Sequence, residues 1–80
     1  MSHNQEVNVT SYYFQNSRVF PRQIELEDGQ LSFLENGLRC IVQKGQELVQ
    51  VFNMSDGNKL YRLSFEPGNR TWTLLSSRSL

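Results

Sequence analysis

The chain has 80 residues, and its eight Lys and Arg side chains balance its eight Asp and Glu side chains. A chain of this length encloses a single hydrophobic core, which excludes a multidomain architecture. The balanced charge excludes an overall field that would draw the protein to nucleic acid or to an acidic membrane, so any basic surface must be local.

The first ten residues, MSHNQEVNVT, are polar, and we expect residues 1–10 to be a flexible N-terminus. They lack the basic region and the apolar run of a signal peptide, and no stretch of the chain approaches the roughly 18 apolar residues of a membrane span. Cys40 is the only cysteine, which excludes an intramolecular disulfide and favours a reducing compartment. We therefore expect a cytoplasmic protein that does not enter a membrane.

Residues 11–76 are predicted to form a single β-meander domain, followed by a C-terminal tail over residues 77–80. Dipeptides with Gly in second place recur every 8 to 12 residues, between segments rich in β-branched and aromatic residues. These dipeptides are Asp28-Gly29, Asn36-Gly37, Lys44-Gly45, Asp56-Gly57 and Pro67-Gly68. The spacing leaves no room for a helix and predicts an all-β fold.

The segment VTSYYFQNSRVF, which precedes Pro21, predicts a further strand and a bend. Its aromatic residues Tyr12, Phe14 or Phe20 are expected to close the open side of the sheet. A sheet with one apolar face and no helix must cover that face by curling or by packing on a second copy. We expect a six- to seven-stranded antiparallel meander, curled into a small half-open barrel.

Matching apolar residues across each turn predicts the register of each hairpin. Two-residue loops at Asp28-Gly29, Asn36-Gly37 and Lys44-Gly45 set Leu26 opposite Leu31, Phe33 opposite Cys40 and Cys40 opposite Val49. A three-residue loop over 55–57 sets Val51 opposite Tyr61, and a four-residue loop over 67–70 sets Phe65 opposite Trp72. The predicted buried face consists of Ile24, Leu26, Leu31, Phe33, Leu38, Cys40, Val42, Val49, Val51, Tyr61, Leu63, Phe65, Trp72 and Leu74.

The opposite face of the predicted sheet mixes arginine and glutamine with large apolar side chains, where an ordinary solvent face carries mostly Lys, Glu, Thr and Ser. Arg39, Gln50 and Arg62 are expected in one row across the strands, and two arginine forks suit an acidic or phosphorylated segment of a partner. The candidate partner-binding residues are Arg39, Gln50, Arg62, Leu34, Ile41, Leu48, Phe52 and Leu75.

Two interpretations that assign no binding function to this face stay open. The arginine stems can lie flat over the apolar residues with their charged ends paired to Glu25 or Glu66, which makes the face an ordinary exterior. Alternatively, the N-terminal segment folds over the face and hides it.

The inventory of reactive side chains predicts no catalytic residue, no metal site and no cofactor. His3 is the only histidine and lies in the expected flexible terminus, and Cys40 has no histidine to activate it. Of the acidic residues Glu25, Glu27 and Asp28, two lie at a turn, and no further oxygen ligands are clustered near them in sequence. We therefore expect a protein that is not an enzyme.

These observations predict a non-enzymatic interaction module, an accessory or regulatory subunit that binds a protein partner. Homodimerisation by the same sheet or by an unpaired edge is compatible with this function. The alternative is a small β-barrel that binds RNA or single-stranded DNA, with bases stacked on aromatic rings and phosphates on cations. The residues of the alternative site are Tyr12, Tyr13, Arg18 and Arg22.

Overall fold

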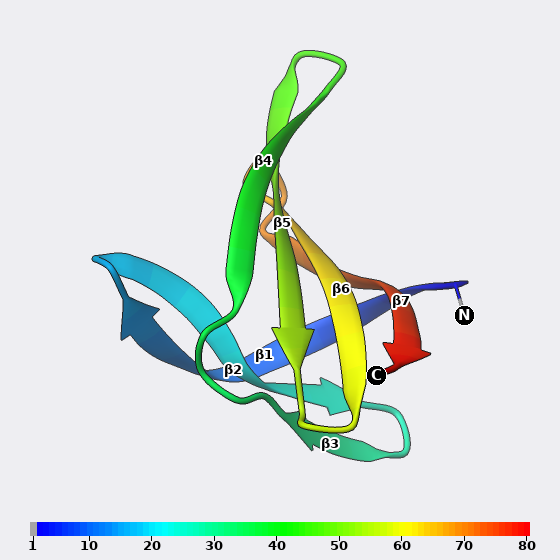
Figure 1. Cartoon of the computed structure of the whole chain (residues 1–80). Helices are drawn as coiled ribbons and strands as arrows, with labels where there is room; N and C mark the ends of the chain where they lie inside the picture. Colours follow the sequence, from blue (N-terminus) through cyan, green and yellow to red (C-terminus); the bar gives the residue numbers. More distant parts are fainter. Residues whose placement is uncertain (1) are drawn as a thin grey trace.

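Seven antiparallel strands form one meander sheet in the computed structural model of the chain, which describes residues 2–80 and the side chains of residues 4–80 (Figure 1). They are β1 (Ser2–Gln15), β2 (Arg18–Leu26), β3 (Gly29–Ser32), β4 (Leu38–Lys44), β5 (Glu47–Ser55), β6 (Lys59–Glu66) and β7 (Thr71–Ser79). The order in the sheet is β3-β2-β1-β7-β6-β5-β4, which leaves β3 and β4 as its edges. The predicted all-β, half-open barrel is confirmed. Residues 2–80 contain no helix long and apolar enough to cross a membrane.

Strand β1 is an interior strand of the sheet and pairs with β2 on one side and with β7 on the other. Gln5 pairs with Leu74 and Val7 with Trp72. Most of the expected flexible N-terminus, residues 1–10, is therefore a paired strand, while Met1 lies outside the described residues. Most of the expected tail, residues 77–80, likewise belongs to β7, which extends to Ser79.

Strands β3 and β4 do not pair, although Asn36-Gly37 predicts a hairpin between them. Residues 33–37, here called the crossing segment, instead run from one edge of the sheet to the other. The Phe33 N–H donates to the carbonyl of Arg22 and the Leu34 N–H donates to the carbonyl of Ser55, both at 2.7 Å. These two bonds tie the crossing segment to β2 and to β5. Strands β3 and β4 themselves stay unpaired, so the barrel is half-open.

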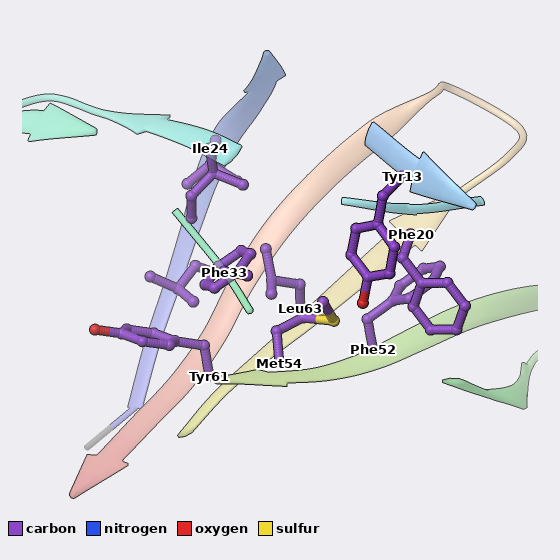
Figure 2. Close-up of a cluster of buried hydrophobic side chains, with 10 residues drawn as sticks. Tyr13, Phe20, Ile24, Phe33, Phe52, Met54, Tyr61 and Leu63 are labelled. Carbon is purple, nitrogen blue, oxygen red and sulfur yellow. The ribbon is translucent and has the colours of Figure 1, made fainter. Parts of the chain in front are cut away.

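The core lies inside the curled sheet and contains many aromatic rings (Figure 2). Tyr13 stacks on Phe20 at 5.4 Å between centroids, Phe20 meets Phe52 edge-on at 5.6 Å, and Phe52 lies 5.2 Å from Trp72. These four rings come from β1, β2, β5 and β7, so they hold the two halves of the sheet together. The buried cluster consists of Val7, Tyr13, Phe20, Ile24, Phe33, Phe52, Met54, Tyr61, Leu63 and Leu74.

The faces of β4 and β5 differ from the prediction. The core takes Phe52 and Met54 from β5, whereas Val49 and Val51 are buried outside the core cluster. The cysteine predicted to be buried is exposed. The residues of β4 that were expected in the core but are exposed to solvent are Leu38, Cys40 and Val42.

The turn between β5 and β6 explains this difference. Ser55 pairs with Leu60 and Val51 pairs with Ser64, so the pairing of β5 with β6 is shifted by three residues from the predicted pairing of Val51 with Tyr61. Asp56 Oδ1 accepts hydrogen bonds from the backbone N–H groups of Asn58 and Lys59, each at 2.8 Å. Because side chains alternate along a strand, a pairing shift by an odd number of residues reverses the face that β5 presents to β6.

The same turn perturbs two titratable groups. The backbone N–H groups of Asn58 and Lys59 hold the pKa of the Asp56 carboxyl below its usual value. Burial, together with the hydrogen bond that the Tyr61 hydroxyl donates to Asp56 Oδ2 at 3.0 Å, raises the pKa of Tyr61. Both shifts favour the charge states that the hydrogen bonds require, so the turn is well defined at neutral pH.

The remaining registers keep the predicted faces. Phe65 pairs with Trp72, as predicted for the loop over 67–70. Ile24 pairs with Leu31, and Cys40 pairs with Val51, so these two hairpins are each shifted by two residues from the prediction. A shift of two changes the partners of a residue but not the face on which it lies.

Candidate functional site

The structure brings together two members of the predicted row and separates the third. Arg39 and Gln50 lie on the same face of the hairpin formed by β4 and β5, where Arg39 Nε donates to Gln50 Oε1 at 3.0 Å. Ile41 pairs with Gln50 and shares that face. Arg62 pairs with Asn53 and points to the opposite face of the sheet.

Large apolar side chains are exposed on both faces of this hairpin. Ile41 (52% exposed) and Leu48 (58%) flank the Arg39 and Gln50 pair, whereas Leu38 (70%) and Val42 (43%) lie on the other face. The name hairpin surface is used below for Leu38, Arg39, Ile41, Val42, Leu48 and Gln50. Each face of the hairpin thus exposes two large apolar residues.

The position of the hairpin explains its exposure. Strands β4 and β5 project beyond the rest of the sheet toward their turn (Figure 1), and no residue of β4 is buried. One side of β4 pairs with β5, and its other side has no strand beside it among the described residues. An exposed apolar edge strand is a template for a further strand.

The charge of the hairpin surface is positive. Strand β4 carries Arg39 and Lys44 and no acidic residue. Lys44 Nζ is 3.7 Å from Glu66 Oε1, whereas Arg39 pairs with no carboxylate of the described chain. Because Arg39 contacts Gln50 only through Nε, its two terminal nitrogens are free to bind an acidic group.

The other predicted partner-binding residues do not join this surface. Phe52 is in the core, with 1% of its side chain exposed, and Leu75 is half-buried on β7. Leu34 is 57% exposed, but it belongs to the crossing segment. Phe52 therefore supports the hairpin from within and cannot contact a partner.

The residues of the nucleic-acid alternative are also divided. Tyr13 is buried, and its hydroxyl oxygen accepts the N–H of Gly37 at 3.1 Å. Arg22 lies over the Tyr13 ring at 5.3 Å and pairs with Glu35 at 3.2 Å. Tyr12, Arg18 and Arg22 are exposed, so three of the four residues can be reached by a base or a phosphate, although Arg22 is already paired with Glu35.

No family model, curated protein or solved structure matches the chain. The interpretation of the hairpin surface therefore rests on its own geometry and charge.

Proposed function

We propose that the protein is a non-enzymatic interaction module, an accessory or regulatory subunit that binds an extended segment of a partner protein along β4. The observation that carries this proposal is the exposed, apolar and unpaired edge of β4. In recognition by strand addition, main-chain hydrogen bonds supply affinity, and alternate side chains supply specificity.

The side chains of the hairpin surface define the chemistry of the partner. Ile41 favours an apolar residue beside it on the added strand, because neighbouring strands place side chains of the same face next to each other. Arg39 favours an acidic or phosphorylated residue near it, because β4 offers positive charge alone. The preferred partner is therefore an extended segment that carries an apolar residue and an acidic or phosphorylated residue two positions apart, on the same face of the added strand.

The proposal places the protein in the cytoplasm. Its only cysteine, Cys40, is exposed and unpaired on β4, within the strand that would receive the partner. A reducing compartment keeps such a thiol from forming disulfides with other proteins.

A random peptide library displayed on phage and selected on the pure protein tests the proposal. Enriched peptides are expected to carry an apolar residue and an acidic residue two positions apart. Ile41→Lys is expected to weaken their binding about tenfold or more, because it places a charge within the apolar edge. Arg39→Glu is expected to change the selected charge from acidic to basic.

Phe14→Lys is the matched control, because Phe14 is 77% exposed on β1 and the substitution makes a similar change outside the hairpin surface. Selected peptides that bind Ile41→Lys as well as they bind the wild type would refute the proposed site. Preferential binding of single-stranded RNA, falling steeply with salt, would instead support the nucleic-acid alternative. Sedimentation equilibrium of the protein alone distinguishes self-pairing of β4 from capture of a partner.

A further inference from the structure

A second surface feature lies on the opposite face of the sheet from Ile41 and Leu48. It is a groove of about 550 Å³ between the crossing segment and the ends of β5, β6 and β7. A groove of this volume suits a small organic ligand or a single side chain of a partner. Its lining includes Leu38, Asn53, Leu60, Arg62, Ser76 and Arg78.

The strand registers place these side chains in two adjacent rows. Asn53 pairs with Arg62, and Arg62 pairs with Ser76. In the neighbouring row Leu60 pairs with Arg78. Arg62 and Arg78 are therefore diagonal neighbours on one face, and such neighbours lie about 7–8 Å apart, within the reach of two arginine side chains.

No carboxylate of the described chain neutralises this pair of arginines. Both are exposed, and neither forms an ion pair with residues 4–80. Glu35, which also lines the groove, is paired with Arg22 at 3.2 Å. The carboxyl of Asp56 in the adjacent turn accepts the N–H groups of its own turn and the Tyr61 hydroxyl.

Two neutral polar groups in the groove are also uncommitted. The amide of Asn53 and the hydroxyl of Ser76 hydrogen-bond to no side chain or backbone group of the described residues. Leu38 and Leu60 add apolar walls beside them. The groove thus combines two positive charges, two neutral hydrogen-bond donors and an apolar flank.

We propose that this groove binds a phosphate monoester attached to an apolar or aromatic body. The phosphate of a monoester carries a charge of about −1.5 to −2 at neutral pH and three acceptor oxygens, which match two arginine forks and two neutral donors. A carboxylate offers a single charge and two oxygens and leaves part of this donor set unused. The apolar walls distinguish an ester from inorganic phosphate.

An NMR titration of the labelled protein with phenyl phosphate tests the proposal, with inorganic phosphate and benzoate as comparison ligands. Phenyl phosphate is expected to shift the backbone amide signals of Asn53, Arg62 and Ser76 and to bind more tightly than either comparison ligand. Arg62→Gln and Arg78→Gln are each expected to weaken its binding about tenfold, because each removes a charge-assisted partner.

Arg18→Gln is the matched control, because Arg18 is an exposed arginine in the first position of β2, outside the groove. Binding that is unchanged in both groove variants, or no shift at these amides, would overturn the proposal. Equal binding of benzoate would overturn the preference for phosphate, and equal binding of inorganic phosphate would overturn the role of the apolar walls. The groove variants leave Ile41 and Arg39 unchanged, so peptide selection on β4 can fail or succeed independently of this result.

Discussion

Tyr13 is the residue that ties the crossing segment to the core. Its ring stacks on Phe20, and its hydroxyl oxygen accepts the buried N–H of Gly37. A side chain at position 37 would meet the flexible end of the buried Met54 side chain, whose Cε lies 2.7 Å from an added Cβ, so a larger residue there would have to displace Met54. The Asn-Gly dipeptide thus marks a buried crossing point rather than a hairpin turn.

Tyr13→Phe is predicted to lower the free energy of unfolding by about 1–3 kcal/mol, because it leaves the Gly37 N–H buried without its acceptor. Tyr12→Phe is the control, since Tyr12 is 49% exposed and an equivalent change there should stay within about 0.5 kcal/mol. Urea unfolding of the wild type and the two variants provides the comparison. Equal losses in the two variants would contradict the role assigned to the hydroxyl of Tyr13.

At the scale of the element, β4 is a strand whose two faces are both in solvent. Cys40 is exposed on it, and its neighbours Leu38 and Val42 on the same face are exposed as well. The exposed thiol is predicted to react with a disulfide reagent in the native protein at a rate comparable to that of the unfolded chain. Stopped-flow labelling with and without denaturant measures both rates. Labelling that requires unfolding would show that β4 turns this face to the core.

The hairpins of this fold follow from local sequence, but the local sequence does not determine which face of each strand is buried. The loop over 67–70 and the pairing of Phe65 with Trp72 were predictable because turn residues and apolar matching agree there. The faces of β4 and β5 were predicted from an unbroken series of hairpins starting at β3. That series fails at the crossing segment, which is held by Phe33 and Leu34 bonds to distant strands, and at the turn that Asp56 stabilises.

The candidate site was predictable only in part for the same reason. Arg39, Gln50, Ile41 and Leu48 were placed on one face correctly, because a shift of two residues in the β4 and β5 register preserves faces. Arg62 was placed with them through the turn between β5 and β6, where the strand pairing is shifted by three residues from the prediction. Its structural neighbour is Arg78, which the prediction had assigned to the C-terminal tail over residues 77–80.

At the scale of the whole molecule, the half-open barrel leaves two edges of unequal character. Strand β3 has four residues, whereas β4 has seven and carries the exposed apolar side chains. Lys44 and Glu47 flank a two-residue turn in which Gly45 has a positive φ of 63°. Because hydrogen-bonded and non-hydrogen-bonded pairs alternate from such a turn, the N–H groups of residues 39, 41 and 43 are expected to point to the open edge.

Amide hydrogen exchange of β4, measured by NMR with and without a peptide selected on the protein, tests strand addition most directly. The amides of Arg39, Ile41 and Gln43 are predicted to exchange fast in the free protein and slowly in the complex, because the added strand accepts their hydrogen bonds. The intervening amides of Cys40 and Val42 already face β5 and should change less. A bound peptide that leaves Arg39, Ile41 and Gln43 exchanging as fast as before would show that the partner does not bind along β4.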